Sequence, residues 1–290
     1  MTAVAVPLAA SAGAAVAARV LEPAVRRAPA ALLRTNVSGR PVPAVLGVPL
    51  SAGTLAGLAA AAVVRSSPSG DRRRILAVGA GLCVTMASAG HFDDRRGEEA
   101  ARGFRGHLVE LSRGRLTGGA VKMAAGALGG GVAGRVLADG RAAVEIAALV
   151  ALGANWVNLL DRAPGRAAKV SIALGGSLLV AGACGWRPAG AAVLGALIPC
   201  VGPDLDERAM LGDAGANALG AVLALGLALS LGARGRRVAI AALAALTAAS
   251  ERWSYSRVIE RVGVLAWVDG LGRASSPRPR FPGGPAAEPA

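Results

Sequence analysis

The chain has little charge and few aromatic side chains for its 290 residues: 17% of the residues are charged and 3% are Phe, Trp or Tyr. A soluble domain would carry about 25% charged residues. The apolar content comes instead from Ala, Leu, Val and 41 glycines, and the mean hydropathy is +0.50. Small residues let helices approach closely in lipid. The composition therefore argues against an ordinary soluble domain and favours a multi-pass membrane protein, one domain of packed helices.

Cysteine is scarce, and the sequence also lacks the features of a cleaved signal. Cys83, Cys184 and Cys200 lie within or at the edge of apolar runs and have no metal-ligand spacing. We interpret them as small helix-packing residues, so they imply neither a disulfide nor a metal site. The start, MTAVAVPLAASAGAAVAARV, has no basic region, and many more apolar segments follow it. A retained first helix is therefore expected.

Arginine supplies most of the positive charge. The formal net charge is +14, and Lys122 and Lys169 are the two lysines among 32 basic residues. Strong basicity can indicate nucleic-acid binding, but these arginines are not gathered in one basic domain. They stand in the short gaps between apolar runs, where arginine marks membrane ends and attracts anionic lipid or phosphate. No nucleic-acid partner is therefore expected.

The apolar runs predict the fold. A membrane-spanning helix needs about 20 mainly apolar residues, and roughly nine stretches approach that length. They lie at residues 2–20, 42–64, 75–91, 119–138, 142–160, 169–184, 188–203, 214–232 and 238–250. We predict an all-α fold, a polytopic membrane helix bundle of about nine transmembrane helices, over residues 1–250. Residues 251–273 would form a cytoplasmic amphipathic or substrate loop, and the Pro/Gly-rich tail 274–290 is expected to be disordered.

The placement of arginine and lysine predicts the orientation. With the N-terminus outside, most basic residues fall inside, as the positive-inside rule requires, although the clusters 72–74 and 234–237 fall outside. The polar connections then share the cytoplasmic face; they are 21–41, 92–118, 161–168, 204–213 and the segment after Ser250. A membrane enzyme builds an interfacial site from separate loops in this way.

Acidic residues stand at the cytoplasmic ends of several expected helices: Asp93, Asp94, Asp161 and Asp213. An acid drawn below the lipid headgroups is costly unless a cation or a metal compensates it. Helix-end acids are often simply solvated, which is the alternative for any one of them. Four such acids on one face favour a functional site.

Two local patterns add to this expectation. Residues 155–161 read NWVNLLD, so Asn155, Asn158 and Asp161 follow at intervals of three and are expected to form one polar stripe on a helix. Residues 211–220 read LGDAGANALG, in which glycines flank Asp213 just before an apolar span. Glycines beside an acid allow a phosphate or a metal to approach the backbone at a helix start.

In this order the motifs resemble those of the polyprenyl-phosphate N-acetylhexosamine-1-phosphate transferase superfamily. That family has a DD motif after an apolar helix, an N-x-x-N-L-x-D-G-x-D-G motif, and an M-G-D-x-G-S motif before another helix. The counterparts here are Asp93-Asp94, then Asn155, Asn158 and Asp161, then Gly212-Asp213-Ala214-Gly215. The loop LRTNVSGRPVPAVLG resembles the family's basic loop through Asn36, and Lys122 stands where the family has a lysine at a helix start.

The resemblance implies a Mg²⁺-dependent enzyme of the cell membrane. It would transfer a sugar 1-phosphate, of the N-acetylhexosamine type, from a UDP-sugar to a polyprenyl phosphate at the cytoplasmic face, releasing UMP, for cell-envelope polymer synthesis. Both substrates are polyanions, so a cation that neutralises and orients them suits the reaction. A homodimer is a further expectation from the family. By resemblance, Asp213 and Asp94 bind the metal, Asp93, Asp94 and Asp161 are the catalytic acids, and Asn36, Lys122, Asn155, Asn158 and Gly215 contact substrate.

The chain departs from the family pattern in two places. Pro164 stands where the family has the second aspartate of D-G-x-D-G. The histidine-rich loop that helps to bind the uridine sugar is missing, since His91 and His107 both lie around the first polar loop. Residues 251–273 stand in its place. They would form either a different substrate loop or an amphipathic helix lying on the membrane.

An insertion, GEEAARGFRGHLVELSRG, separates the DD motif from Lys122. Its Arg102, Arg105 and His107 would either contact phosphate or belong to an exposed amphipathic turn.

Other function classes remain as alternatives. Because of the departures, a diverged family member that keeps the scaffold but acts as a binding or assembly partner in the envelope is the second hypothesis. A secondary transporter would show an internal repeat, and we find none. The D-x-x-D-G-x-x-A-R spacing of CDP-alcohol phosphotransferases is absent around Asp93.

Overall fold

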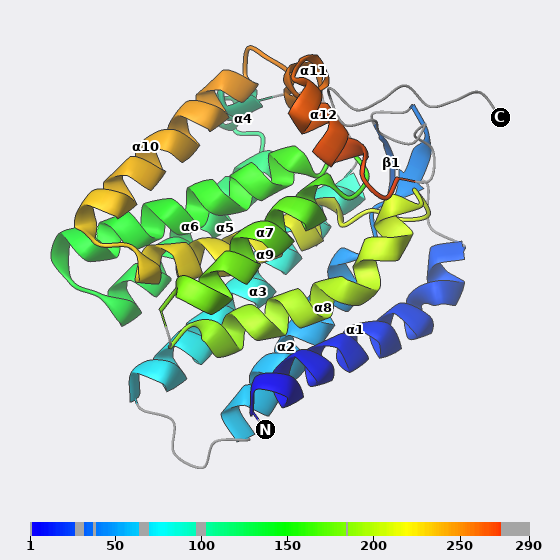
Figure 1. The fold of residues 1–290 in the computed structure, drawn as a ribbon. Coiled ribbons are helices and arrows are strands. Elements are labelled where there is room, and N and C mark those ends of the chain that lie inside the picture. The colour runs from blue at the N-terminus through cyan, green and yellow to red at the C-terminus, as the bar shows by residue number, and fades with distance from the viewer. Residues whose placement is uncertain are drawn as a thin grey trace.

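The computed structural model describes residues 2–26, 32–36, 39–63, 70–96, 103–183 and 185–273. These residues form a mostly helical bundle with one small β-hairpin (Figure 1). The elements are α1 (Thr2–Arg26), β1 (Leu33–Thr35), β2 (Pro41–Pro43), α2 (Gly47–Val63), α3 (Gly70–Arg96), α4 (Gly103–Ser112), α5 (Gly118–Leu137), α6 (Gly140–Leu160), α7 (Arg166–Ala181), α8 (Arg187–Leu205), α9 (Gly212–Ser230), α10 (Ala233–Ser250), α11 (Tyr255–Arg261) and α12 (Gly263–Gly270).

Helix α9 lies at the centre of the bundle, where α3 and α6 pack along it and α2 and α7 also contact it. The packing depends on small residues: a Cβ added to Gly220 would lie 2.6 Å from the main-chain oxygen of Gly153 on α6. The fully buried Trp186 packs against Gly226 and donates a hydrogen bond of 3.0 Å from its ring nitrogen to the Val222 carbonyl. The abundance of glycine and alanine therefore allows this close helix packing.

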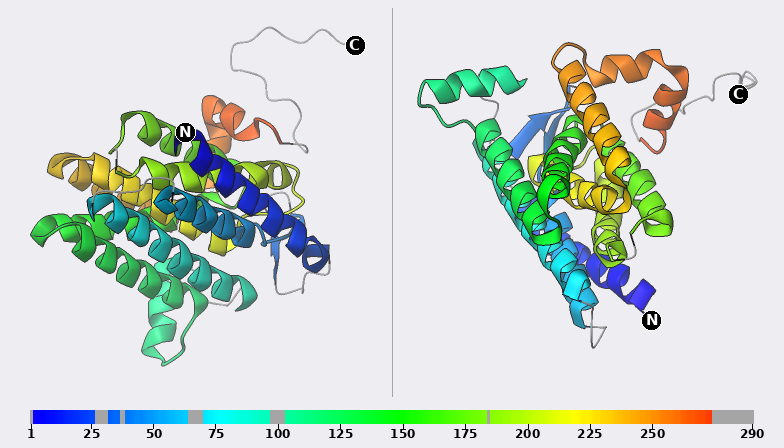
Figure 2. Two further views of the ribbon diagram at one scale, coloured as in Figure 1. Left: turned by 90° about the horizontal axis from the view of Figure 1, so that it is seen from below. Right: turned by 90° about the vertical axis from the view of Figure 1, so that its left-hand side faces the viewer.

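The outer helices form two groups. Helices α1, α2 and α8 pack together on one side, whereas α5 and α6 pack together on the other (Figures 1 and 2). Helix α10 contacts α6, where Arg236 Nε lies 2.7 Å from Oε2 of the buried Glu145. Of α10, all of which the structure describes, only Leu243 is buried. Helix α4 stands out from the bundle beside α5 (Figure 2).

Four helices of the described chain are long and apolar enough to cross a membrane. They are Gly70–Arg95, Gly140–Leu160, Arg187–Leu205 and Gly212–Ser230. The four suggest a membrane protein.

Every apolar range expected from the sequence lies in or overlaps a helix, but nine spans are not confirmed. Helix α7 has 16 residues, and at about 1.5 Å per residue it falls short of a hydrocarbon core about 30 Å thick. Helix α10 begins with ARGRR, and the apolar residues 238–250 that follow are too few to cross such a core.

Residues 251–273, expected as a substrate loop or an amphipathic helix, contain the short helices α11 and α12, whereas α4 and the hairpin were not expected. The proposed tail 274–290 lies outside the described residues, as do Arg102 and the side chains of Arg105 and His107.

Candidate functional site

The expected acids meet at one end of the bundle, around the first turn of α9. Asp94 Oδ1 accepts a hydrogen bond of 3.1 Å from the Asp213 N–H, and Asp94 Oδ2 accepts one of 3.0 Å from the Ala214 N–H. Asp161, just after α6, accepts a hydrogen bond from the Gly212 N–H. The first N–H groups of a helix have no partner within it and favour negative charge. Asp94 and Asp161 therefore cap α9 from two different helices.

Glycine is required where α9 begins. Gly212 has a φ of +66°, a left-handed conformation that glycine adopts without strain. A Cβ at this position would also lie 2.9 Å from Asp94 Oδ2. The glycine that precedes Asp213 in the sequence motif thus lets Asp94 reach the helix start.

Lys122 joins two of the acids. Its Nζ lies 2.5 Å from Asp93 Oδ2 and 2.7 Å from Asp213 Oδ2. Asn158 also donates a side-chain hydrogen bond to Asp213, and Asn217 Nδ2 bonds to the Asp213 carbonyl at 2.6 Å. Asp93, Asp94, Asp161, Asp213 and Lys122 are called the acidic centre below.

Arg34 supports the acidic centre from the hairpin, outside the helices that carry its five residues. It extends from β1, and its Nη2 donates to the carbonyls of Asp94 at 2.5 Å and Asp93 at 3.4 Å. These carbonyls lie at the end of α3, where orphan acceptors need partners. Sequence reasoning missed this role of Arg34, although its loop was recognised as basic.

A small pocket lies beside the acidic centre. Its polar lining is supplied by Asn36, Asp161, Arg162, Asp204 and Glu207. Asn36 Nδ2 donates to Glu207 Oε2 at 2.8 Å, which ties the hairpin loop to the loop after α8. Asp204 accepts the Gly165 N–H at 3.1 Å. Asp204 and Glu207 were not predicted individually; the acidic run PDLDE, which spans the end of α8 and the start of the next loop, was the available signal.

Asp161 is buried at the wall of this pocket, and its Oδ2 has no hydrogen-bond partner in the described part of the chain. Burial raises the pKa of Asp161 well above its ordinary value, and the charges of Asp204 and Asp213 raise it further. A ligand that brings a cation or a hydrogen-bond donor would satisfy this oxygen.

Two of the predicted site residues, Asn155 and Gly215, contact neighbouring helices. Asn155 Nδ2 donates to Thr247 Oγ1 of α10 at 3.2 Å instead of joining Asn158 at the acidic centre. Three residues fall short of a full helical turn, so the expected polar stripe drifts around α6. Gly215 packs against Gly47 at the start of α2; a Cβ on Gly215 would lie 2.9 Å from the Gly47 Cα. Close helix packing accounts for this glycine.

A second charged cluster ties α12 to the start of α7. Arg166 Nε and Nη2 donate to the two carboxylate oxygens of Asp269, each at 2.8 Å, and Arg273 Nη2 lies 2.6 Å from Asp269 Oδ2. Lys169 Nζ donates to the Asp269 carbonyl at 2.5 Å. We call these four residues the Asp269 cluster. Burial raises the pKa of Asp269, but the hydrogen bond and charge of Arg166, with Arg273, lower it overall below its ordinary value.

The acidic centre suits a hard cation that takes only a few of its ligands from the protein. In the described chain no group of three or more Asp, Glu, His or Cys side chains is arranged to hold a metal by itself. Mg²⁺ commonly takes one or two carboxylates and fills its other positions with water and substrate phosphate. The orphaned oxygen of Asp161 and the excess of carboxylates over Lys122 fit such a cation.

No protein-family model matches the chain, and no curated protein matches it by sequence. Family membership therefore stays a prediction that depends on the motifs and on the chemistry of the site.

Proposed function

We propose that the chain is a membrane phosphoglycosyl transferase of the polyprenyl-phosphate N-acetylhexosamine-1-phosphate transferase superfamily. It would transfer a sugar 1-phosphate from a UDP-sugar to a polyprenyl phosphate at the cytoplasmic face of the cell membrane, for cell-envelope polymer synthesis. The observation that carries the proposal is the contact of Lys122 with Asp93 and Asp213 at the start of α9. The first N–H groups of that helix are already bonded to Asp94 and Asp161, so Lys122 and a cation held by the acids would neutralise the phosphates.

The reaction joins two polyanions. An oxygen of the lipid phosphate forms a bond to the phosphorus that carries the sugar, and the bond from that phosphorus to UMP breaks. Catalysis of this kind requires mainly positioning and charge stabilisation. Lys122 would pair with phosphate as a compact positive charge, and Asn158, which contacts Asp213, would hydrogen-bond to the nucleotide or phosphates.

The acids would divide the remaining tasks. Asp213, with Asp94 beside it, would hold Mg²⁺, which supplies neutralisation of the phosphate charge. Asp93 would orient the lipid phosphate or accept its proton. Asp161, whose Oδ2 has no partner in the described chain, would help to order the phosphates or their cation. Asn36 would contribute from the pocket it lines with Asp161.

The membrane arrangement belongs to the same proposal. The four apolar helices would be part of a polytopic bundle of about nine transmembrane helices, some shorter than average. The acidic centre would then lie at the cytoplasmic interface, where a soluble nucleotide sugar and a membrane lipid meet. A homodimer follows from the family resemblance.

The test is UMP release from UDP-N-acetylglucosamine and undecaprenyl phosphate with Mg²⁺ by purified wild-type protein in lipid. Asp213→Ala is expected to reduce the rate by about 10²–10³-fold, because it removes a charge-positioning group. Asp206→Asn is the matched control, since Asp206 is exposed and pairs with Arg208. Turnover that survives Asp213→Ala would exclude the metal role of Asp213.

One observation favours a second function. Lys122 and the backbone of α9 already satisfy many of the acidic oxygens within the chain. A diverged protein that retains this centre for stability and acts as a binding or assembly partner in the envelope would show the same contacts. Absence of turnover by the wild-type protein with every UDP-amino-sugar tried would support it.

A further inference from the structure

Exposed apolar side chains cover one face of the α11–α12 segment. Val264, Leu265, Val268 and Leu271 are between 39% and 53% exposed. Val264, Leu265 and Val268 lie at i, i+1 and i+4 on one side of α12, and Leu271 follows directly after the helix. Trp253, just before α11, is 61% exposed. A contiguous apolar face of this kind on a folded protein marks a contact with another apolar surface.

The Asp269 cluster fixes the direction in which this face points. Asp269 is buried, and its carboxylate is held by Arg166 and Arg273. Lys169 adds hydrogen bonds to the carbonyls of Val268 and Asp269. The inner side of α12 is therefore attached to the bundle by polar contacts. The apolar side chains remain on the outer side, away from these contacts.

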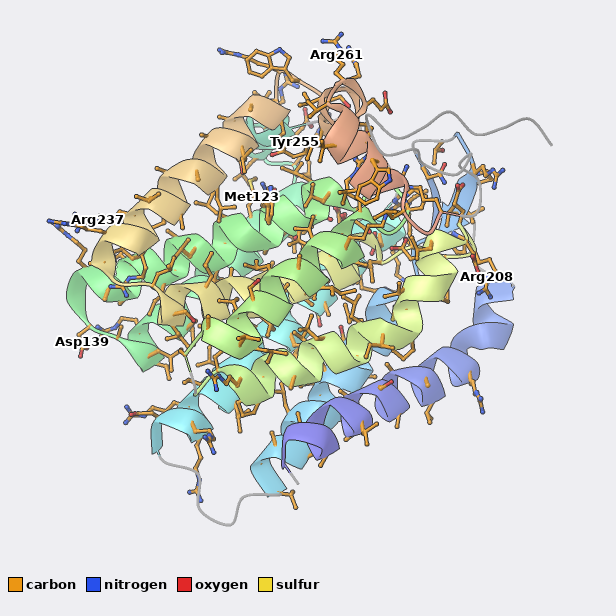
Figure 3. All side chains as sticks on the ribbon, in the orientation of Figure 1. Met123, Asp139, Arg208, Arg237, Tyr255 and Arg261 are labelled. Carbon is orange, nitrogen blue, oxygen red and sulfur yellow. The ribbon has the colours of Figure 1, made fainter. Side chains whose placement is uncertain are left out.

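The α11–α12 segment lies at one end of the bundle. Figures 1 and 2 show α11 and α12 at the end where α6 and α8 finish and α7 and α9 begin. A bilayer crossed by α6, α8 and α9 would have one of its interfaces at this end. Exposed charges lie before and within α11: Arg252, Arg257 and Arg261, with Glu251 and Glu260. In Figure 3 the Arg261 side chain extends away from the bundle.

We propose that α11–α12 docks on the anionic lipid interface of the membrane that the bundle crosses. The apolar face of α12 lies among the outer parts of the acyl chains, and Trp253 lies at the headgroup level. The exposed arginines contact lipid phosphates. The proposal concerns the lipid contact of the C-terminal segment and does not depend on the transfer reaction.

Lipid suits this face better than a second copy of the chain. Helices α11 and α12 have seven and eight residues, whereas a standard protein interface needs about 800 Å² from each partner. Helix α11 also adjoins α10, whose Leu246 is exposed: the Tyr255 hydroxyl donates to the Leu246 carbonyl at 2.8 Å. Exposed apolar side chains on the flank of a membrane bundle face lipid.

Spin labels on the full chain test this placement. The three native cysteines are replaced by alanine, and single cysteines are introduced by Val264→Cys or Val268→Cys. The matched control is Arg208→Cys, on an exposed loop at the same end of the bundle. Each labelled protein is reconstituted in vesicles of equal phosphatidylcholine and phosphatidylglycerol. Power saturation then compares relaxation by oxygen, which enters lipid, with relaxation by a nickel chelate, which stays in water. Thermal unfolding confirms that each labelled variant is folded.

The proposal predicts that oxygen relaxes the labels at 264 and 268 more strongly than the nickel chelate, while the reverse holds at 208. In vesicles of phosphatidylcholine alone, the preference for oxygen at 264 and 268 should fall, because the arginines lose their anionic partners. Stronger relaxation by the nickel chelate at 264 and 268 would overturn the proposal. Exclusion of both reagents, with a short distance between labels on two copies, would also overturn it and identify a dimer contact.

Discussion

Two charged clusters at the same end of the bundle have opposite excess charge. The acidic centre contains four carboxylates and one ammonium, that of Lys122, which contacts two of them. The Asp269 cluster gathers Arg166, Lys169 and Arg273 around one carboxylate. Both clusters join segments that are distant in the sequence. The two clusters differ in how completely their carboxylate oxygens are paired with cations.

This difference separates a structural cluster from a candidate site. Both oxygens of Asp269 receive a guanidinium N–H from Arg166 in a bidentate pair, the arrangement in which buried ions are best compensated. In the acidic centre a single ammonium faces two carboxylates, and the Asp161 Oδ2 has no partner in the described chain. A buried site with excess negative charge can accept a cation, whereas both oxygens of Asp269 already have a partner of opposite charge.

The largest expected effect comes from removing the one cation of the acidic centre. Lys122→Met keeps the side-chain length but leaves Asp93 and Asp213 without their shared partner. The rate of UMP release should fall by about 10²–10³-fold, because a preorganised charge that faces the phosphates is lost. Arg208→Met, which removes an exposed arginine at the same end, should retain the wild-type rate. A Lys122→Met rate within a few-fold of wild type would show that Lys122 has only a packing role.

Removing a cation from the Asp269 cluster should affect the attachment of α12 to the bundle more than the rate of UMP release. Arg166→Met removes the bidentate partner of a buried carboxylate, a loss of about 3–5 kcal/mol for buried pairs. Amide hydrogen exchange in α12 should accelerate by about 10²-fold or more, while exchange in the buried α9 stays slow. The control is Arg208→Met, an exposed arginine at the same end of the bundle. Unchanged protection in α12 would mean that other contacts hold the segment.

The acidic centre was largely predictable because helix ends are marked in the sequence. Apolar runs indicate roughly where each helix ends. Because successive helices run in opposite directions, Asp94, Asp161 and Asp213 were expected at the same end of the bundle. Rotation about a helix axis is harder to predict. Asn155 was expected beside Asn158 but contacts Thr247, because steps of three residues drift around α6.

The Asp269 cluster could not be predicted in the same way. Arg166 and Asp269 are separated by 103 residues, and neither stands in a recognisable motif. Their pairing depends on how the C-terminal segment folds back onto the bundle. The helices α11 and α12 are also too short to appear as apolar runs. Local patterns thus identified the helix-end acids, whereas the second cluster required the three-dimensional packing.

A glycine of α3 tests how tightly the acidic centre is packed. A Cβ on Gly90 would lie 2.4 Å from the main-chain carbon and oxygen of Asp213, and these backbone atoms cannot rotate away as a side chain can. Gly90→Ala should destabilise the protein by about 1–3 kcal/mol through overpacking. Gly81→Ala is the control on the same helix, because no atom lies within 4 Å of its added Cβ. It should be neutral or stabilising by up to about 1 kcal/mol. Both are measured by thermal unfolding; equal stability of the two variants would contradict the close contact.

The smallest expected effect is a dependence of α12 attachment on acid pH. The pKa of Asp269 is lowered by Arg166 and Arg273 in the folded chain, so the unfolded chain binds a proton more readily. The stabilisation by Asp269 is therefore fully present above its ordinary pKa of about 3.9 and is lost as the pH falls through the lower folded value. A spin label at Val268 should become more mobile only below about pH 4. In Asp269→Asn the mobility should be higher at neutral pH, and acidification should change it less than in the wild type. If wild type and Asp269→Asn respond identically to pH, the ion pairs of Asp269 do not control the attachment of α12.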